Sequence, residues 1–517
     1  MKKCKLTYLN KEYEIFEGTL LSEFMIRNGI EQERPCGGTG RCGKCKVKFI
    51  YGAPKPGNAD KSFLTESEIE AGIRLSCRAV ITEDARIDKV YYSDNISDNL
   101  QSGSKDPIKK PQADEIKGEV SIALDIGTTT IAAAVMQEKD GGDPEQVSKT
   151  TIMNHQRRYG ADVISRIQAA NSGKAKELRD CVVDDIKSIT AGLKIKQMMI
   201  AGNTTMLHLL TGDSCEGLGK APYTPVRLSY PKLKANELIL YKEERKSETE
   251  CLLAPGISAF VGADIVSGMY ALSFDRIPKG KRYMLIDLGT NGEMAVADSE
   301  RISVCSTAAG PVFEGGGISC GMPGVTGAIE HVTLKEDAEL GVIGGEKPLG
   351  ICGSGVLELV SELRRTKAID ETGLFEDKYF EEGFPLYKGD ESTEGIFFTQ
   401  NDIRAVQLAK AAIRSGIDTL LEAHDCRPED IDKVYLAGGF SEHLDTSKVR
   451  FLKLLPEEFI GRDVCECVGN TSLLGCIKAL GDKDFTDRMN TIVSMAVEIK
   501  LAETDEFGDS FIEAMNF

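Results

Sequence analysis

Four cysteines near the start of the chain have a spacing that can hold a metal cluster. Cys36, Cys42 and Cys45 are spaced C-x5-C-x2-C within PCGGTGRCGKC. A fourth, Cys77, follows in RLSCRAV. A [2Fe–2S] cluster needs four thiolates, usually three from one tight loop and the fourth from a distant strand, and glycines let the loop wrap the cluster. The spacing therefore predicts an iron–sulfur site with these four ligands.

The same stretch admits other interpretations. Gly38 to Lys44 has the G-x-x-x-x-G-K spacing of a phosphate-binding P-loop, but Cys45 stands where that motif has Ser or Thr to bind Mg²⁺. A zinc site usually uses two C-x2-C pairs, and this loop has one. Four buried cysteines without a metal are a further alternative. The loop 34–48 also carries five basic and no acidic residues, which favours an acidic partner or offsets the charge of an anionic cluster.

Two later segments have the residues of phosphate-binding turns. LDIGTTTIAAAV (124–135) resembles IDLGTNGEMAVA (286–297), and each places an Asp at the end of an apolar run, before Gly and polar residues. Backbone N–H groups and hydroxyls in such a turn can surround phosphate, and the Asp can hold Mg²⁺ through water. An ordinary β-turn explains one copy, but two copies favour a nucleotide bound between two related halves.

Each half also contains an apolar strand that ends in Ala-Gly. These strands are MMIAGNTTM (198–206) and VYLAGGFSEHL (434–444). From Asp125 to Ala201 is 76 positions, whereas from Asp287 to Ala437 is 150. The second half therefore contains about 74 extra residues, which we place mostly between residues 315 and 400, and two facing α/β halves are the simplest architecture.

The elements around the cysteine loop are those of a small mixed domain. Residues 3–9 and 12–16 alternate apolar and polar side chains and predict a hairpin. Thr19 is a candidate N-cap of a helix that runs to about Asn28, with Glu23 near the capping-box position. Further strands are expected at 47–51 and 78–81. A small sheet packed on one helix fits residues 1–90.

Composition limits the class of protein. The chain has 517 residues, 41% of them hydrophobic, which is enough for two to four domains. Residues 93–117 are polar and charged and predict a linker. We expect no membrane span, no signal peptide and a cytoplasmic location, in which fifteen cysteines are not expected to form disulfides. The net charge of −18 argues against nucleic acid as a partner.

The motifs resemble two known families. Residues 1–90 resemble a β-grasp ferredoxin domain, and the two halves resemble the actin, Hsp70 and sugar-kinase ATPase superfamily. Asn203 lies in an additional turn near the expected nucleotide, and VGNTSLLGCIKAL (468–480) resembles that superfamily's closing helix, but no first connecting helix is identifiable. The resemblance implies a first phosphate motif at Asp125, Gly127, Thr128, Thr129 and Thr130, a second at Asp287, Gly289, Thr290, Asn291 and Gly292, and an adenosine motif at Ala437, Gly438, Gly439 and Phe440.

A carboxylate is needed to position the attacking water. Glu293 follows the second phosphate loop, and Glu314 lies in AAGPVFEGGGISCGMPG. Either is a candidate, although each could instead be a solvated or capping carboxylate. The glycine-rich run 315–327 is interpreted as a functional loop, in which Ser319 and Cys320 could contact a partner's cofactor or serve a core or turn role.

The whole chain resembles the reductive activators of corrinoid-dependent methyltransferases, which restore Co(II) corrinoid proteins to Co(I) with ATP hydrolysis. The resemblance implies a [2Fe–2S] cluster, ATP and Mg²⁺, a corrinoid protein as partner, a low-potential electron donor and a homodimer. We expect a ferredoxin-like domain over 1–92, a linker over 93–117 and ATPase subdomains over 118–279 and 280–517. A small-molecule kinase with a fused ferredoxin domain, an ATP-dependent activator of another low-potential enzyme and a bare electron carrier are the alternatives.

Overall fold

A computed structural model provides the structure of the chain. It describes residues 2–90 and 118–517, apart from positions 10, 29, 31, 33–37, 39, 41–42, 138–143, 239, 241–247, 336–337, 346, 390–394 and 439–445. The predicted linker at 93–117 lies outside the described residues. None of the described helices is long and apolar enough to cross a membrane.

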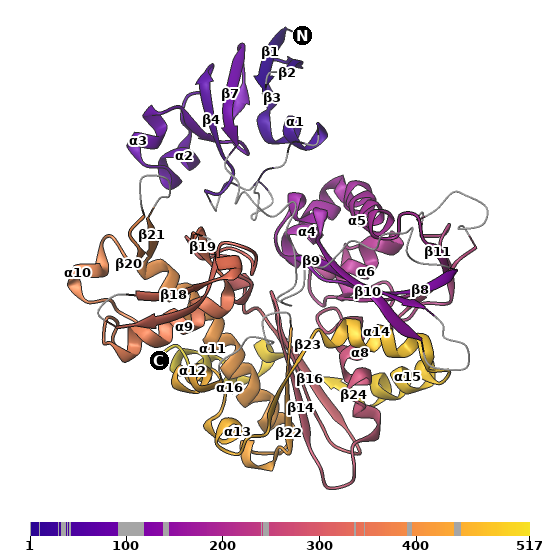
Figure 1. The fold of residues 1–517 in the computed structure, drawn as a ribbon. Coiled ribbons are helices and arrows are strands. Elements are labelled where there is room, and N and C mark those ends of the chain that lie inside the picture. Colours follow the sequence, from indigo (N-terminus) through magenta and orange to yellow (C-terminus); the bar gives the residue numbers. More distant parts are fainter. Residues whose placement is uncertain are drawn as a thin grey trace.

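The N-terminal residues form a five-stranded mixed sheet with strand order β2-β1-β7-β4-β5 (Figure 1). Helix α1 (Leu21–Arg27) buries Leu21, Phe24 and Met25 in the core that the sheet lines. This β-grasp arrangement confirms the predicted fold of the domain. Its strands and remaining helices are β1 (Lys3–Tyr8), β2 (Lys11–Phe16), β3 (Thr19–Leu20), β4 (Lys46–Tyr51), α2 (Asn58–Phe63), α3 (Glu66–Glu70), β5 (Ile73–Leu75), β6 (Val80–Ile81) and β7 (Ala85–Val90).

Local sequence explains the hairpin but not the start of α1. Strand β1 buries Cys4 and Leu6 and exposes Lys3 and Lys5, which alternate with them along the strand. The expected cap at Thr19 was wrong, because Thr19 lies in β3 and its hydroxyl donates to the Phe16 carbonyl oxygen at 2.6 Å. The residue before the helix is Leu20, which has no capping side chain. Pairing of β3 with β6 therefore sets where the chain enters α1.

The next part of the chain forms a six-stranded sheet with strand order β10-β9-β8-β11-β13-β12. Its central strand β8 is buried along most of its length, as expected for a strand covered on both faces. The elements of this half are β8 (Glu119–Ile126), β9 (Thr130–Gln137), β10 (Glu145–Met153), α4 (Val163–Ala169), α5 (Ala175–Ile189), β11 (Lys194–Gly202), α6 (Thr204–Thr211), β12 (Leu233–Lys234), β13 (Glu250–Leu253) and α8 (Ala263–Ala271).

A second six-stranded sheet has the order β23-β22-β14-β15-β16-β24. Its long helix α11 packs on β15 and β16, where Ile413 approaches Gly292. The elements of this sheet and its helices are β14 (Tyr283–Leu288), β15 (Gly292–Ala297), β16 (Ile302–Thr307), α11 (Gln400–Ala423), β22 (Lys433–Ala437), α12 (Thr446–Phe451), α13 (Glu457–Gly461), β23 (Cys465–Gly469), α14 (Thr471–Gly481), α15 (Phe485–Met495), β24 (Ala496–Glu498) and α16 (Asp505–Glu513).

Strand register confirms the predicted duplication. In the first sheet Asp125 on β8 lies opposite Ala201 on β11 in a parallel pair. In the second sheet Asp287 on β14 lies opposite Ala437 on β22 in the same kind of pair. The two Asp residues therefore end equivalent central strands, and the two Ala-Gly turns follow equivalent neighbours.

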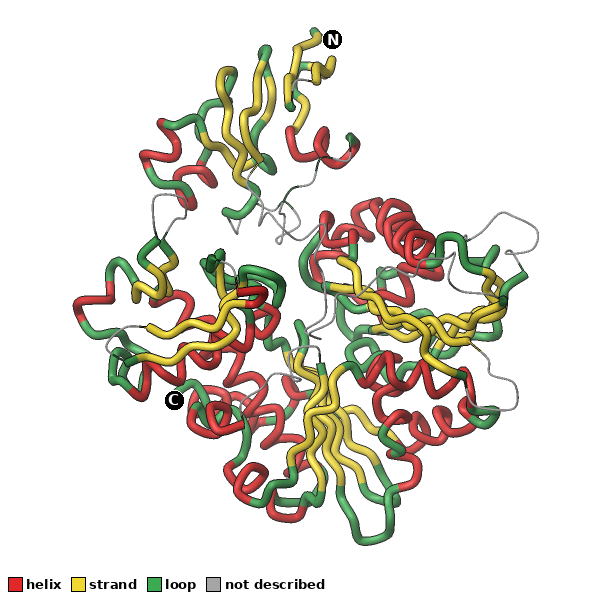
Figure 2. The backbone as a smooth tube through the Cα atoms, in the orientation of Figure 1, coloured by secondary structure: helices red, strands yellow, loops and turns green. Residues whose placement is uncertain are grey.

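The second half also contains the insertion expected between residues 315 and 400. It forms a three-stranded sheet, a separate hairpin and two helices, which lie beside the second sheet (Figure 2). Its elements are β17 (Ala328–Leu334), β18 (Ala338–Val342), β19 (Gly350–Ile351), α9 (Gly353–Arg365), α10 (Asp377–Phe380), β20 (Phe384–Tyr387) and β21 (Ile396–Phe398). The short helical turns of the whole chain are η1 (His155–Tyr159), η2 (Ala170–Lys174), η3 (Gly217–Gly219), η4 (Phe274–Arg276), η5 (Pro311–Glu314), η6 (Ile343–Gly345), η7 (Pro428–Asp430) and η9 (Leu501–Glu503).

Helices α8 and α14 cross between the two sheets, in one core to which both halves contribute (Figure 1). Their backbones approach closely: a Cβ atom added at Gly475 would lie 2.1 Å from the Ser267 carbonyl oxygen, and one at Gly268 would lie 2.7 Å from Thr471 Oγ1. Helix α8 is the first connecting helix that the sequence did not reveal. The crossing fixes how the two sheets face each other.

Adding one methyl group at this crossing tests its importance. We expect Gly475→Ala to lower the free energy of unfolding by about 1–3 kcal/mol, because the new Cβ forces two helix backbones apart. Gly508→Ala on α16 is a matched control, since nothing lies within 4 Å of its added Cβ. The control should be neutral or stabilising, because alanine favours a helix. Chemical denaturation measures both, and equal stabilities would contradict the close crossing.

Candidate functional site

The first phosphate loop joins β8 to β9 and is held by the start of α14. Asn470 Nδ2 donates to Asp125 Oδ2 at 2.7 Å, and Ser472 Oγ donates to Asp125 Oδ1 at 2.8 Å. Both donors belong to the segment at 468–480 that was predicted to close the nucleotide site. Thr130 begins β9 after the turn at Gly127. The Asp125 carboxylate is therefore fixed in orientation by two residues that follow it by 345 and 347 positions in the sequence.

Three polar side chains from the first half hold this loop through hydrogen bonds. Asn203 caps α6 and donates from Nδ2 to Thr128 Oγ1 at 3.1 Å. Asn154 Nδ2 donates to the Gly127 carbonyl oxygen at 2.8 Å, and Arg166 Nη2 donates to the Thr128 carbonyl oxygen at 2.5 Å. Asn154 and Arg166 are fully buried and were missed from the sequence, because no local motif marks them.

The second loop meets the first through Glu314. Thr129 Oγ1 donates to Glu314 Oε2 at 2.6 Å, and Thr290 Oγ1 donates to the same oxygen at 3.0 Å. The two hydroxyl oxygens are 3.4 Å apart. Residues 161 positions apart in sequence are thus neighbours, and the predicted phosphate-binding hydroxyls of the two halves converge.

The predicted glycines of the second loop have different surroundings. Gly289 donates its N–H to the Asn291 carbonyl oxygen at 3.1 Å and closes the turn. Gly292 begins β15 and faces Ile413 of α11, so that a Cβ there would lie 2.1 Å from Ile413 Cδ1. Packing on α11 explains this glycine without a contact to phosphate. Its assignment to nucleotide binding stays a prediction.

Five carboxylates share this junction, and we call them the carboxylate cluster: Asp125, Asp264, Asp287, Glu293 and Glu314. Burial raises the pKa of Asp287 to about 8, and the negative charges of Asp264, Asp125 and Glu314 add to the effect. Burial likewise raises the pKa of the other four carboxyls, and neighbouring carboxylates add to the shift for Asp264 and Glu293. Such a group of like charges is unfavourable unless protons or a cation neutralise it.

The cluster separates into carboxylates with and without donor side chains. Glu293 accepts a hydrogen bond from Asn291 Nδ2 at 3.2 Å, and Asp125 and Glu314 have the partners given above. Asp264 and Asp287 have no donor side chain among the described residues. Asp264 lies in the first turn of α8, in VGADIVSGM, and was missed from the sequence. An acidic residue opening an apolar helix after a glycine was the available signal.

The expected adenosine side begins where β22 ends. A Cβ atom at Gly438 would lie 2.5 Å from the Leu288 carbonyl oxygen and 3.1 Å from Asp287 Oδ1. Only glycine therefore brings this turn against the second phosphate loop without a clash, which fits a nucleotide crossing both. Gly439 and Phe440, the remaining predicted adenosine residues, lie outside the described residues.

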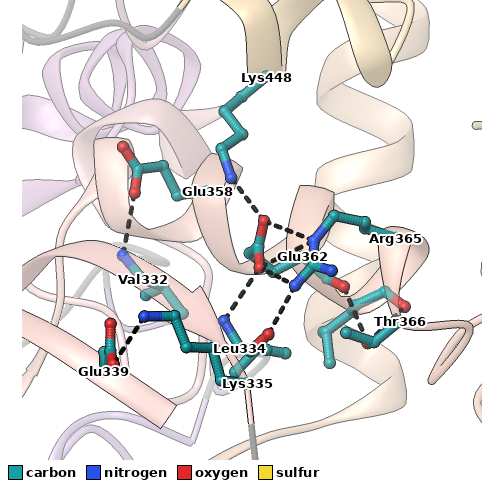
Figure 3. A network of polar contacts seen from close by, with 10 residues as sticks. Val332, Leu334, Lys335, Glu339, Glu358, Glu362, Arg365, Thr366 and Lys448 are labelled. Atoms are coloured by element: carbon teal, nitrogen blue, oxygen red, sulfur yellow. Dashed lines mark hydrogen bonds and ion pairs between the residues drawn. The ribbon is translucent and has the colours of Figure 1, made fainter.

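Ion pairs to the buried carboxylate of Glu362 hold the helix that follows this turn (Figure 3). Lys448 of α12 contacts Glu362 of α9, with Lys448 Nζ 2.6 Å from Glu362 Oε1, and Arg365 pairs with the same carboxylate. Burial alone would raise the pKa of Glu362, but the hydrogen bonds from Arg365 and Lys448 lower it to about 2. The Glu362 carboxylate is therefore ionised and keeps α12 against the insertion.

Two of the four predicted cluster ligands are described. Cys45 and Cys77 are each 2% exposed and belong to one small core with Leu75. The Ser76 N–H donates to the Cys45 carbonyl oxygen at 2.8 Å, so the two cysteines lie on adjacent backbone segments. This arrangement fits thiolate ligands of one buried group. Cys36 and Cys42 lie outside the described residues, and within the described part of the chain no three His, Cys, Asp or Glu side chains are arranged to hold a metal.

The glycine-rich segment after Glu314 is an ordered turn. Asp402 of α11 accepts hydrogen bonds from the Ser319 N–H and the Ser319 hydroxyl, both at 2.6 Å. Burial raises the pKa of the neighbouring Cys320 thiol to about 12, whereas the charge of Lys44 in the cysteine loop acts in the opposite direction. The segment 315–327 therefore runs from the carboxylate cluster to Cys320, on which the charge of Lys44 acts.

The raised pKa of Asp287 predicts the pH dependence of stability. The folded protein keeps a proton on Asp287 that the unfolded chain loses near its ordinary value of 3.8. The stability that this proton contributes therefore falls as pH rises from 3.8 to about 8 and is lost above that range. In the nucleotide-free protein, Asp287→Asn should weaken this loss and raise Tm near pH 8 by about 3 °C. Asp432→Asn is the control, because Asp432 pairs with Lys281 and its pKa is lowered. An unchanged pH slope of Tm in Asp287→Asn would contradict the assignment.

Family models cover nearly the whole described chain. Residues 281–517 match the C-terminal domain of RACo, which is described as the ASKHA domain, and residues 120–277 match the RACo middle region. Residues 7–82 match a 2Fe-2S iron-sulfur cluster binding domain. Each model matches one of the sheet-containing parts described above.

Individual relatives are similar over comparable lengths. The chain is 27% identical to a corrinoid activation enzyme, RamQ, of Eubacterium limosum, with 98% of this chain and 97% of the relative covered. It is 23% identical to a [Co(II) methylated amine-specific corrinoid protein] reductase of Methanosarcina barkeri, with 77% and 76% covered. A solved reductive activator for corrinoid, iron-sulfur protein has a TM-score of 0.69, at 26% identity and 100% and 98% coverage. The resemblance drawn from the motifs is confirmed: the chain belongs to the RACo family of reductive activators, in which a [2Fe–2S] domain is joined to an ASKHA ATPase domain.

Proposed function

We propose that this chain uses ATP to return a corrinoid protein from its Co(II) to its Co(I) state for methyl transfer. The electron leaves a [2Fe–2S] centre held by Cys36, Cys42, Cys45 and Cys77. The observation that supports this most directly is the union, in one chain, of two buried neighbouring thiols and two converging phosphate loops. The relatives named for corrinoid activation or reduction support the choice of partner.

Energy explains why electron transfer is joined to an ATPase. A [2Fe–2S] centre supplies single electrons, at about −400 mV in plant-type ferredoxins. A one-electron gap of 59 mV corresponds to about 1.4 kcal/mol, so an uphill step of a few hundred mV costs several kcal/mol. Nucleotide that binds two conformations with different affinity can supply coupling of this size.

The chain's own residues have separate roles in this proposal. Hydroxyls of the two loops and their backbone N–H groups bind the phosphates of ATP. Asp125 and Asp287 orient Mg²⁺ through its water ligands. Asp264, which has no donor side chain among the described residues, is placed to accept a proton from the attacking water, whereas Glu293 and Glu314 already accept hydrogen bonds. Mg²⁺ binding also offsets the repulsion within the carboxylate cluster.

We further propose a low-potential electron donor and a homodimer, as the family resemblance implies. The division into residues 1–92, 93–117, 118–279 and 280–517 is part of the same proposal. The donor must reduce the iron–sulfur domain without ATP, because the two functions lie in different parts of the chain. Size measurement by light scattering tests the dimer.

The iron–sulfur site and the ATPase should be separable. We expect Cys77→Ala to lose the visible spectrum of the cluster and most of its iron, since three thiolates and a vacant position hold it poorly. Its rate of ATP hydrolysis should stay within about twofold of the natural chain, because Cys77 lies in a small core of the N-terminal domain that contains no residue of the ATPase halves. Cys4→Ser is the control for a buried cysteine of the same domain that lies outside the loop. Full iron content in Cys77→Ala would remove Cys77 as a ligand.

Reduction of a corrinoid protein should require ATP. With the intact chain, a reduced low-potential donor and a Co(II) corrinoid protein, anaerobic visible spectroscopy should show Co(I) forming with Mg-ATP. Asp125→Ala should prevent this and leave the iron content unchanged. Equal Co(I) yields with and without ATP would reject the activator and favour a bare electron carrier.

A further inference from the structure

One carboxylate oxygen accepts a hydrogen bond from one threonine hydroxyl of each phosphate loop. Thr129 and Thr290 each donate to Oε2 of Glu314, and we call this three-residue contact the Glu314 clasp. A threonine hydroxyl has a single proton to donate. While the clasp is closed, neither proton is available to a phosphate oxygen. The same hydroxyls cannot serve Glu314 and a phosphate together.

Charge increases this competition. A terminal phosphate and the Glu314 carboxylate are both negative, and their repulsion is stronger in a partly buried site than in water. A phosphate bound between the two threonines therefore displaces the Glu314 side chain. ADP has one phosphate fewer than ATP, so a diphosphate that leaves the threonine position empty leaves the clasp closed. The clasp can thus distinguish the two nucleotides by length.

The backbone of Glu314 is tightly packed against neighbouring segments. Glu314 ends η5, and the Gly316 N–H donates to the Pro311 carbonyl oxygen at 2.8 Å. A Cβ atom at Gly321 would lie 2.1 Å from the Gly315 carbonyl oxygen, so the backbones of the two sides of the loop are in contact. A Cβ atom at Gly353 would lie 2.0 Å from the Phe313 carbonyl oxygen, which presses η5 against the start of α9. A shift of the Glu314 backbone therefore also shifts the turn that follows it.

Cys320, in the middle of segment 315–327, is the residue of this turn on which a charge of the N-terminal domain acts. Cys320 lies one residue beyond Ser319, which is anchored to Asp402. Lys44 of the cysteine loop is close enough for its charge to act on the Cys320 thiol. In Figure 1 the N-terminal domain lies above the insertion of the second half. Segment 315–327 thus connects the carboxylate cluster to Cys320, whose thiol lies within the influence of the Lys44 charge.

We propose that Glu314 is a positioning residue through which ATP controls the position of segment 315–327. ATP takes the Thr129 and Thr290 hydroxyls, the clasp opens, and the segment shifts. With ADP or without nucleotide the clasp is closed and the segment stays in the position described. This inference rests on the proposed function only in that the junction binds ATP.

Cys320 provides a direct readout of the clasp. Its thiol is partly buried and has a raised pKa, and thiols react with iodoacetamide as thiolates. In the holoprotein we expect ATP, but not ADP, to raise the alkylation rate of Cys320 by about tenfold, the change in thiolate that follows from one unit of pKa. Peptide mass spectrometry after a short pulse measures it, with exposed Cys467 as the internal reference.

Glu314→Gln tests the residue itself. The neutral amide oxygen accepts hydrogen bonds from the two hydroxyls more weakly than a charged carboxylate oxygen does, so Cys320 should react faster even without nucleotide. The Kd for ATP should fall by about fivefold or more, and the Kd for ADP should not change. Glu300→Gln, an exposed glutamate of the same half, should behave as the natural chain in both measurements.

Two threonine variants cover the case in which Glu314→Gln folds poorly. Thr129→Val removes the closer donor and should raise Cys320 reactivity without nucleotide, whereas Thr129→Ser keeps a hydroxyl and should restore the slow rate. Slow alkylation in Glu314→Gln and Thr129→Val with no response to ATP, or equal tightening of ATP and ADP, would overturn the proposal. Neither readout needs a corrinoid protein, so failure of Co(I) formation alone would reject the proposed function and not the clasp.

Discussion

The crossing of α8 and α14 is the contact on which the arrangement of the ATPase halves depends. Because small residues allow the two backbones to touch, the first turns of both helices reach the same point. Helix α8 brings Asp264 there, and α14 brings the two donors that orient Asp125. A wider crossing would separate these groups, so helix packing and the geometry of the phosphate site are one problem.

Burying five carboxylates at that point is unfavourable in free energy, and other contacts of the protein must offset it. Neutral amides and hydroxyls fix three of the carboxylates. The fully buried guanidinium of Arg166 donates a hydrogen bond to the backbone of the first loop. Burial lowers the pKa of Arg166 to about 9. The nucleotide-free junction therefore stores unfavourable electrostatic energy, which a magnesium ion and a phosphate chain can release on binding. The electrostatic energy released when nucleotide and Mg²⁺ bind can drive a change of conformation.

Local motifs predicted much of the fold, whereas long-range contacts needed coordinates. The Asp and Ala-Gly repeats correctly placed equivalent strands, since Asp125 and Asp287 lie opposite the expected alanines. Asp264 and Arg166 could not be found, because their importance comes from residues distant in sequence. Thr19 was misassigned as a cap because its pattern is local and the pairing of β3 with β6 overrides it. The roles of the predicted site residues stay predictions.

The N-terminal domain touches the ATPase halves lightly within the described residues. The ion pair between Glu23 and Lys174 spans 4.0 Å, with both side chains about one-third exposed, and such pairs contribute little. The domain has its own core and matches a general iron–sulfur model, unlike the rest of the chain. Recombination can therefore replace this domain with another electron-carrying domain without changing the nucleotide-binding residues. Relatives of this protein can then differ in their source of electrons and share the same ATPase halves.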